Sequence, residues 1–464
     1  MQGFIARLGE TLDPAGLLTN PAEMAPYLTD WRHVCTGEAV AVLRPGSTEQ
    51  VAKAVRICAE HDVRIVPQGG NTGLAGGATP TGIGPQVVLA LARMNRIREI
   101  DRTGLVAEVE AGVILQTLRE EVAKKGRLLP VSLASQGSAM VGGIIATNAG
   151  GVNVLRYGMT RDFVLGLEVV LADGTVIGGP KRLRKDNAGY DWKQLFIGSE
   201  GAFGIVTAAS LRLVPAPRYR TVALVTVADV GAAIDLMDLF LDRIGETLTA
   251  FELISGRSMR LVDEKLGMQA PMSNGQWYLL IEVSSSLAGL REETEATLAS
   301  GLETGLILDG TLAATELQAD AIWALRENIT EAEARAGKSL KHDISLPLAR
   351  IAGFLDLFET QLADLAPSTR SNVFGHLGDG NLHVNVTLEG SELPDLKAAI
   401  TAMVHDLAFD VGGSISAEHG LGQLRLDEYR RLAPKAEQDL LSDLKSVVDP
   451  ARRLNPGKAI PFDC

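Results

Sequence analysis

The sequence predicts an α+β fold built from more than one structural unit, and three observations lead to this prediction. The chain has 464 residues, more than a single hydrophobic core usually organises. Short apolar strand patterns alternate with amphipathic helical patterns, and the first half is dense in glycine-rich loops. The pattern changes around Pro215–Pro217, so we expect a domain boundary there.

The first region opens with a helical pattern that follows a capping signal. Ser47 with Gln50 is typical of a helix start, and apolar residues on one helical face follow at Val51, Val55 and Cys58. Further along the chain we expect strands at 63–66, 86–91 and 105–110, a helix at 114–124, and a hairpin formed by 164–171 and 175–177 around the turn Ala172–Asp173–Gly174.

The second region repeats a strand followed by an amphipathic helix. Residues 221–227 and 277–283 read as strands, and 232–241 and 287–304 as the helices that follow them. This repetition predicts an antiparallel sheet covered by helices. The tail from about Pro394 is expected to be mostly helical and contains the sequence LNPGKAI.

Composition narrows the classes of protein to which the chain can belong. Apolar residues make up 46% and charged residues 22%, as in ordinary globular proteins. The formal net charge is −13 and no basic cluster occurs, which argues against nucleic-acid binding. The 3 cysteines (Cys35, Cys58 and Cys464) suit a reducing compartment rather than a disulfide framework. With neither a signal peptide nor an apolar span in view, we expect a cytoplasmic protein.

Three glycine-rich stretches occur in the first region: Pro67–Gly77 (PQGGNTGLAGG), Gly137–Gly151 (GSAMVGGIIATNAGG) and Gly198–Thr207 (GSEGAFGIVT). Glycines let backbone N–H groups converge on an anion such as pyrophosphate, and Asn71 and Thr72 could add side-chain donors. Neither the GxGxxG nor the GxxxxGK[ST] pattern is present, so another type of dinucleotide or phosphate cradle is indicated. The alternative for any one stretch is a tight surface turn.

A cluster of histidines is the sharpest chemical signal in the second region. His376 and His383 flank the turn sequence LGDGN, so a hairpin would bring their rings together and place Asn385 on the same strand face as His383. With Glu418 as the third ligand, two imidazoles and a carboxylate can hold a divalent ion and leave positions open for substrate. The alternative is that these histidines satisfy hydrogen bonds in the core.

Other polar residues are weaker candidates. Arg326 and Lys341 have apolar neighbours that could strengthen a contact with a carboxylate, although most such side chains lie on a solvated face. No role is assigned to the remaining histidines, which are His33, His61, His342 and His405.

The motifs, taken in order, resemble the FAD-linked oxidase family of the vanillyl-alcohol oxidase type, and most closely its D-2-hydroxyglutarate dehydrogenase branch. They span nearly the whole chain: PQGGNTGLAGG, ATNAGG with LRYG, LGLEVVLADGT, RKDNAGYDWKQLFIGSEG, GHLGDGNLHVNV and SAEHGLG. RKDNAGYD and KHDISLP are similar to the hydroxyglutarate branch, whereas D-lactate enzymes tend to have DVCVP where DISLP stands here.

The resemblance implies a two-subdomain FAD-binding domain at 36–216 after an N-terminal segment at 1–35, a substrate domain at 217–393, and a C-terminal helical segment at 394–464 that returns to the FAD domain. No histidine or cysteine lies in the first glycine-rich stretch, so the FAD is expected to be bound non-covalently. The implied FAD-binding residues are Pro67, Gln68, Gly69, Gly70, Asn71, Thr72, Gly73, Leu74, Gly137, Ser138, Gly142, Gly143, Thr147, Asn148, Gly150, Glu200, Gly204, Val206 and Asn455.

The resemblance also implies roles around the substrate. The metal ligands would be His376, His383 and Glu418, and His419 would be the base that removes the hydroxyl proton while a hydride passes from C2 to the flavin. Zinc is the expected ion, with manganese, cobalt and iron also compatible with this ligand set. The implied substrate contacts are Arg326, Thr330, Lys341, Asn385 and His419, and the extra cation favours a dicarboxylate such as D-2-hydroxyglutarate, with D-malate as a second candidate.

Several alternatives stay open on the sequence alone. The enzyme could be a D-lactate or glycolate dehydrogenase, a true oxidase, or a non-catalytic module that binds flavin and metal. An electron-transfer flavoprotein is a candidate electron acceptor, and a homodimer is compatible with the sequence.

Overall fold

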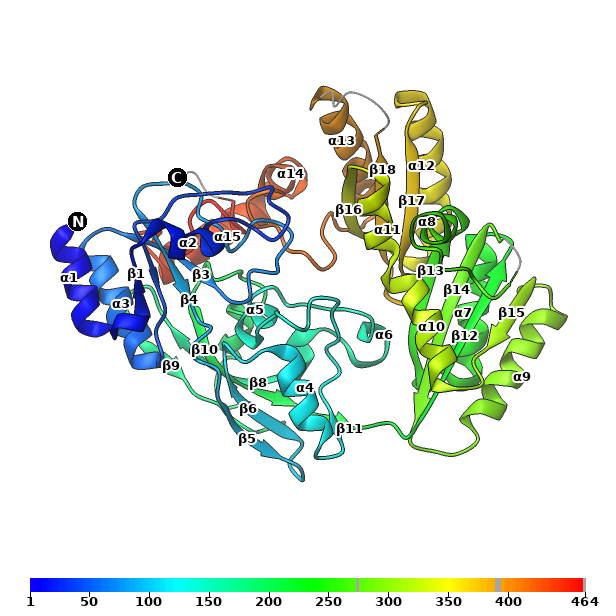
Figure 1. Ribbon diagram of the computed structural model, residues 1–464, viewed down its shortest axis with the longest axis horizontal. Coiled ribbons are helices and arrows are strands. Elements are labelled where there is room, and N and C mark those ends of the chain that lie inside the picture. The colour runs from blue at the N-terminus through cyan, green and yellow to red at the C-terminus, as the bar shows by residue number, and fades with distance from the viewer. Residues whose placement is uncertain (273–274, 389–393, 462–464) are drawn as a thin grey trace. The chain divides into compact units, whose positions relative to one another are not determined.

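The computed structural model describes residues 1–272, 275–388 and 394–461. The chain divides into two compact units, coloured by residue number in Figure 1. The first unit contains residues 1–151, 159–216 and the chain from Glu418 on. The second contains Val152–Gly158 and Pro217–Ala417. Both units mix helices and sheets, which confirms the predicted α+β class.

The first unit is organised around two sheets. In the smaller sheet the order is β1-β2-β4-β3, with β2, β4 and β3 parallel and β1 antiparallel to β2. The larger sheet is antiparallel, in the order β5-β6-β10-β8-β9, and β7 pairs with β11. The strands are β1 (Leu17–Leu18), β2 (Ala41–Leu43), β3 (Arg64–Gln68), β4 (Gln86–Ala90), β5 (Ile97–Asp101), β6 (Val106–Glu110), β7 (Arg127–Leu128), β8 (Val164–Val170), β9 (Val176–Gly178), β10 (Ile205–Arg212) and β11 (Val214–Pro215).

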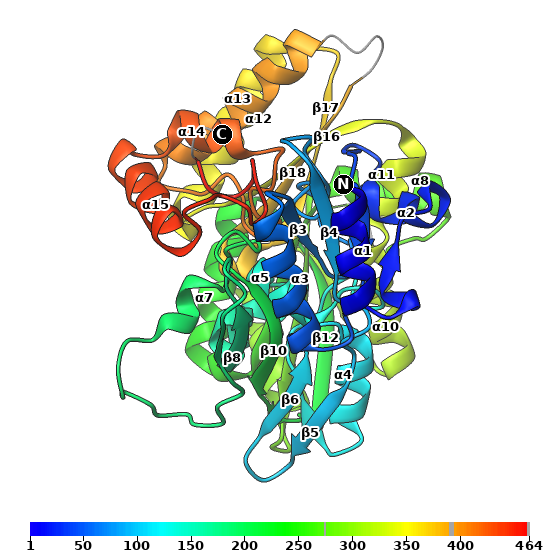
Figure 2. The ribbon, with the colours of Figure 1, turned by 90° about the vertical axis from the view of Figure 1, so that its left-hand side faces the viewer.

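Helices bury the apolar face of the smaller sheet, as Figure 2 shows for α1 and α3. Val51, Val55 and Cys58 of α3 are fully buried, as the helical spacing predicts. The Ser47 hydroxyl accepts from the N–H of Gln50, so the expected cap is present. The helices of this unit are α1 (Gln2–Thr11), α2 (Pro21–Leu28), α3 (Thr48–Glu60), α4 (Leu115–Ala123), α5 (Val141–Ala146), α14 (Leu426–Leu432) and α15 (Lys435–Val448).

The predicted strands and helices are present, with ends displaced by a few residues. The strand expected from residue 105 begins at Val106, because Leu105 has a φ of 57°, a left-handed conformation that cannot continue a strand. The helix expected from residue 287 begins at Leu290, after Gly289 with a φ of 90°.

The second unit is a single antiparallel sheet among the described residues, in the order β15-β12-β14-β13-β17-β18-β16. Each hydrogen-bonded neighbour runs in the opposite direction, as the sequence predicts for the substrate domain. The strands are β12 (Tyr219–Val227), β13 (Leu248–Ser255), β14 (Trp277–Ser285), β15 (Asp309–Leu312), β16 (Ser339–Ser345), β17 (Arg370–His376) and β18 (Asn381–Thr387).

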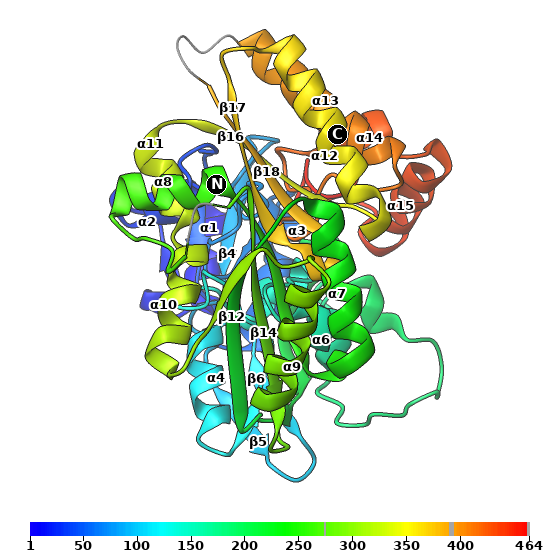
Figure 3. The ribbon, with the colours of Figure 1, turned by 90° about the vertical axis from the view of Figure 1, so that its right-hand side faces the viewer.

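Helices cover both faces of this sheet, as Figure 3 shows. One face packs its aliphatic residues against α7, α9, α12 and α13, and the other packs against α8, α10 and α11. The second face is only partly apolar, which leaves room for polar groups. The helices are α6 (Val154–Tyr157), α7 (Val230–Ile244), α8 (Gly256–Leu266), α9 (Leu290–Glu303), α10 (Glu316–Glu327), α11 (Ile329–Ala336), α12 (Ile351–Leu365) and α13 (Pro394–Asp410).

Two segments depart from the sequence-based division of the chain. The helix α13 belongs to the second unit, because Ile400, Val404 and Ala408 are fully buried in that unit's core, and the chain returns to the first unit at Glu418 rather than at Pro394. The short α6 also belongs to the second unit, where the Arg156 guanidinium donates to Thr249 and Ser284. In the described part of the chain, no helix is long and apolar enough to cross a membrane.

Candidate functional site

The three glycine-rich stretches of the first unit meet one another. A Cβ on Gly70 would lie 1.9 Å from the Ser138 carbonyl oxygen, so only glycine allows the first stretch to approach the second. The N–H of Glu200 donates to the Ala146 carbonyl at 2.8 Å, which joins the third stretch to the second. A Cβ on Gly201 would lie 3.0 Å from the Pro67 ring, so the third stretch also packs against the first.

Residues other than glycine are held in left-handed conformations in each stretch. The φ angles are 53° at Asn71, 49° at Asn148 and 50° at Glu200. Such conformations are costly and persist only where the surrounding structure fixes them, as it commonly does at ligand sites. These conformations favour a ligand-binding role for the three stretches over that of simple surface turns.

The side chain of Asn71 has a different partner from the one expected. Its amide donates to the Thr29 carbonyl at 2.8 Å and thereby attaches the first stretch to the N-terminal segment. The neighbouring Gln68 amide likewise donates to the carbonyls of Tyr27 and Ala78. An anion at this loop would have to be bound by backbone N–H groups or by the Thr72 hydroxyl, because the Asn71 and Gln68 donors are occupied.

The C-terminal part of the first unit closes on the same loops. The Asn455 amide donates to the carbonyls of Gly77 and Glu200, and joins the first and third stretches. The backbone N–H groups of Leu421 and Gly422 donate to the Glu200 carboxylate. Burial raises the pKa of Glu200, and these two donors oppose that shift.

Lys458 is a functional candidate that the sequence reasoning missed, although LNPGKAI was noted. Its side chain is fully buried, and its ammonium donates to the Asn455 amide oxygen at 2.8 Å. Burial lowers the pKa of Lys458 to about 7, and the Glu200 carboxylate opposes the shift. The sequence around Lys458 does not indicate a buried lysine, because the burial of Lys458 depends on the packing of the C-terminal segment in the first unit.

These features suit a bound dinucleotide such as FAD. Convergent loops with little side-chain bulk expose backbone donors, and the expected FAD-binding residues lie in them or beside them. For Gly204, packing within the protein explains the glycine. A Cβ at this position would lie 2.6 Å from Val169 and 2.8 Å from Phe196.

The histidines lie on the polar face of the second unit's sheet, and strand register brings them together. In the hairpin of β17 and β18, His376 pairs with Asn381 and Phe374 pairs with His383. Directly opposed residues share a face, as do residues two apart on one strand. The same face therefore carries Asn385 on β18, Asp343 and Lys341 on β16, and Glu252 on β13.

His376 is held by a buried carboxylate. Its Nδ1 donates to Glu252 Oε1 at 2.6 Å, and Arg326 Nε donates to Glu252 Oε2 at 2.8 Å. Burial would raise the pKa of Glu252, but the facing charges of His376 and Arg326 outweigh it and hold the pKa below its usual value. Glu252 is thus a carboxylate acceptor for a predicted metal ligand and for a predicted substrate contact.

A second buried carboxylate, Glu333 on α11, holds the other predicted substrate contacts. The Asn385 amide donates to both Glu333 oxygens at 2.9 and 3.0 Å, and Lys341 Nζ lies 3.5 Å from Glu333 Oε2. Thr330, on the same helix, is exposed. Sequence reasoning missed Glu333 and Glu252, because a single glutamate in a helix or a strand predicts a solvated side chain.

His383 has a carboxylate neighbour of its own. Its Nδ1 lies 3.5 Å from Asp343 Oδ1, and Asp343 in turn accepts from the Asn381 amide at 2.9 Å. The rings of His376 and His383 are 5.9 Å apart between centroids and nearly perpendicular. Both rings can therefore present one nitrogen to a common point.

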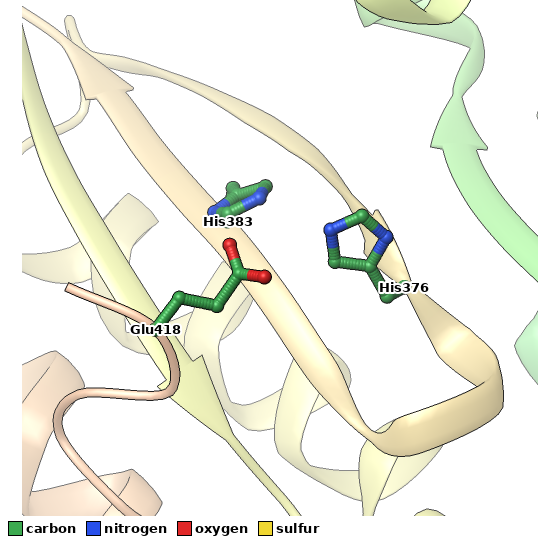
Figure 4. Close-up of side chains that lie close together, drawn as sticks. All are labelled: His376, His383 and Glu418. Carbon is green, nitrogen blue, oxygen red and sulfur yellow. The ribbon is translucent and has the colours of Figure 1, made fainter. Parts of the chain in front are cut away.

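Glu418 completes the expected ligand set. It directly follows Ala417, whose N–H donates to the Asp343 carbonyl at 3.1 Å. One ligand atom from each of His376, His383 and Glu418 lies within 4.8 Å of the others, and Figure 4 shows the carboxylate facing the two rings. Two imidazoles and a carboxylate suit a catalytic divalent ion with open positions.

His419, the predicted base, lies beside a guanidinium. Arg425 Nη2 is 3.2 Å from His419 Nδ1, and because arginine can only donate, Nδ1 is the acceptor in this pair. The neutral ring then carries its hydrogen on Nε2. To take up a proton at Nδ1, His419 would have to lose this contact with Arg425.

Comparison with known proteins gives two domain matches that cover most of the chain. Residues 39–178 match the FAD binding domain, and residues 216–459 match the C-terminal domain of FAD linked oxidases.

Similar proteins cover nearly the same length. The chain is 41% identical to mitochondrial D-2-hydroxyglutarate dehydrogenase of Bos taurus, over 97% of this chain and 82% of the relative. It is 36% identical to a putative mitochondrial D-lactate dehydrogenase of Schizosaccharomyces pombe, over 99% and 89%. Among solved structures, p-cresol methylhydroxylase with substrate bound superposes with a TM-score of 0.80 at 18% identity, over 100% of this chain and 98% of the other. That likeness supports the fold alone.

Proposed function

Since this chain belongs to the FAD-linked oxidase family, we propose that it is an FAD-dependent dehydrogenase that oxidises D-2-hydroxyglutarate to 2-oxoglutarate with the help of a divalent ion. The observation that carries the proposal is the convergence of His376, His383 and Glu418 in a chain with an FAD-binding domain. When bound, FAD supplies a hydride acceptor and the ion supplies Lewis acidity at the substrate oxygens.

The ligand set supports an ion whose other coordination positions are open to substrate. Two neutral imidazoles and the Glu418 carboxylate would hold it, most simply as zinc, with manganese, cobalt or iron as alternatives. A hydroxy acid offers its hydroxyl and a carboxylate oxygen to such an ion. This binding would fix the orientation of C2.

The base we propose is His419, which would receive the hydroxyl proton on Nδ1 after its contact with Arg425 is released. Asn385 would orient the substrate through its amide oxygen, because its NH₂ group is directed to Glu333.

Preference for a dicarboxylate would come from Arg326 and Lys341, with Thr330 nearby on α11. Glu252 uses only the Nε of Arg326, so its two Nη groups are available for a carboxylate. Lys341 lies opposite Asn385 across β16 and β18 and can offer a second cation. A substrate with two carboxylates can use both cations, and a monocarboxylate cannot.

A dye-reduction assay with D-2-hydroxyglutarate, D-malate and D-lactate tests the proposal. We expect the highest kcat/KM with D-2-hydroxyglutarate. Removing the metal with a chelator is expected to abolish turnover while the flavin absorbance stays with the protein, and added Zn²⁺ should restore turnover. Full activity in the metal-free protein would contradict the role of the ion.

Lys341→Met tests the second carboxylate contact. Loss of a charge-assisted hydrogen bond worth about 1.5–3 kcal/mol should lower kcat/KM for D-2-hydroxyglutarate by roughly 10- to 150-fold and leave D-lactate turnover unchanged. Lys338→Met, three residues away and exposed, is the matched control and should change neither.

The second candidate is a D-lactate dehydrogenase, which the similarity to the Schizosaccharomyces pombe protein favours. It predicts the highest kcat/KM with D-lactate in the same assay. Peroxide formation would indicate an oxidase, and no turnover with any hydroxy acid would indicate a non-catalytic module. An electron-transfer flavoprotein as acceptor, a homodimer and a cytoplasmic location stay predictions, and the Bos taurus relative is named mitochondrial.

A further inference from the structure

Glu252 is a buried carboxylate that the proposed ligand set does not include. It lies on β13, inside the second unit's sheet, and only 1% of its surface is exposed. Removing a charge from water is unfavourable unless other groups compensate it. The groups that compensate Glu252 are His376 and Arg326, the very residues assigned to the ion and to the substrate.

Each oxygen of Glu252 has one of these partners. Oε1 accepts from His376 Nδ1 at 2.6 Å, so in the neutral ring the hydrogen lies on Nδ1 and the lone pair lies on Nε2. That is the form in which an imidazole binds a divalent ion. Figure 4 shows one ring nitrogen of His376 facing His383 and Glu418, with the other pointing away.

The other oxygen accepts from Arg326 Nε at 2.8 Å. The guanidinium carbon also lies 4.8 Å from the centre of the Phe374 ring, so the plane of the group is fixed by a carboxylate and by stacking. Phe374 is itself packed against His383, with ring centroids 5.0 Å apart. Arg326 therefore has little rotational freedom left to lose when a carboxylate binds.

We propose that Glu252 is a positioning residue that couples the ion to the substrate, because one carboxylate fixes both the ligand tautomer of His376 and the orientation of Arg326. The inference rests on the proposed function, and it assigns Glu252 no contact with the reacting atoms. Loss of either oxygen as an acceptor should disturb one partner and leave the sheet intact.

Glu252→Gln tests the inference, because glutamine keeps the shape and has one acceptor oxygen instead of two. We expect Zn²⁺ affinity, measured in the purified flavoprotein by competition with a chromophoric chelator, to fall by about 10- to 100-fold. The KM for D-2-hydroxyglutarate should rise at saturating Zn²⁺. Glu252→Asp, which keeps the charge on a shorter side chain, should give an intermediate affinity, and thermal unfolding with a normal midpoint shows that each variant folds.

Glu333→Gln is the matched control, since Glu333 is equally buried but holds Asn385 and Asn372 instead of a metal ligand. It should raise KM and leave Zn²⁺ affinity unchanged. Wild-type Zn²⁺ affinity in Glu252→Gln would overturn the inference while the proposed metal site stands. A wild-type protein that binds no Zn²⁺ would overturn the proposed metal site and the inference together.

Discussion

At the scale of single residues, the partner of a side chain decides which of its atoms can take part in chemistry. Nδ1 of His376 is committed to Glu252, and the NH₂ group of Asn385 is committed to Glu333. The atoms left over, an imidazole Nε2 and an amide oxygen, are a metal ligand and a hydrogen-bond acceptor. Each residue type alone would have allowed several roles.

His419→Gln tests the base at this scale. Loss of general-base catalysis is expected to lower kcat by roughly 10²- to 10⁴-fold, because glutamine can accept a hydrogen bond but cannot take up the proton. Zn²⁺ content and flavin content should stay normal, which separates this effect from loss of the site. His33→Gln, at an exposed position, is the control, and near-wild-type turnover of His419→Gln would show that another group removes the proton.

At the scale of elements, close approach of backbone segments explains why the loops are rich in glycine. The first stretch reaches the Ser138 carbonyl only because Gly70 has no Cβ, and the third stretch is joined to both others. In the second unit, the register of β17 and β18 brings the site residues together, because it decides which side chains share a face of the sheet.

Gly70→Ala and Gly73→Ala compare, within one loop, a glycine that protein packing requires with a glycine that has open space beside it. A Cβ at Gly70 meets a backbone oxygen at 1.9 Å, whereas a Cβ at Gly73 meets no protein atom within 4 Å. We expect Gly70→Ala to lower the free energy of unfolding by about 1–3 kcal/mol and Gly73→Ala to leave it unchanged. Denaturant titration of both variants, with flavin absorbance recorded on the same samples, provides the measurement; equal stabilities would contradict the packing argument.

At the scale of the whole molecule, the chain crosses between its units more than once, and this brings charged residues beside segments that are distant in sequence. The C-terminal segment brings the fully buried Lys458 beside Asn455 and Glu200 in the first unit. Lys445 is buried in the same way, and its ammonium donates to Asp449 at 2.7 Å and to the carbonyls of Ala202 and Leu454. These lysines are buried only because the C-terminal segment packs in the first unit.

The stability of the protein should depend on pH through Lys458. Burial lowers its folded pKa to about 7, while the unfolded value is near 10.5. Between these values the unfolded chain binds a proton that the folded chain lacks, so the free energy of unfolding rises with pH, by up to about 1.4 kcal/mol per pH unit.

Lys458→Met is expected to remove this contribution, which denaturant titrations at pH 7, 8 and 9 can measure. Lys435→Met, at an exposed position on α15, is the control and should keep the wild-type slope. If Lys458→Met also keeps that slope, Lys458 does not change its protonation in this range.

The sequence by itself determined the α+β class, the elements within a few residues, and the candidate ligands His376, His383 and Glu418. These features depend on local periodicity, on turn chemistry and on the spacing of residues within short motifs, all of which are written in neighbouring residues. The sequence could not indicate that Asn71 binds a protein carbonyl or that α13 packs in the second unit. Nor could it indicate that Glu252 and Glu333 are buried beside the histidines and Asn385, or that Lys458 is buried beside Asn455. Those facts depend on contacts between segments that are far apart in the chain. The register of the strands and the return of the chain to the first unit decide which charged groups are buried and which residues they contact.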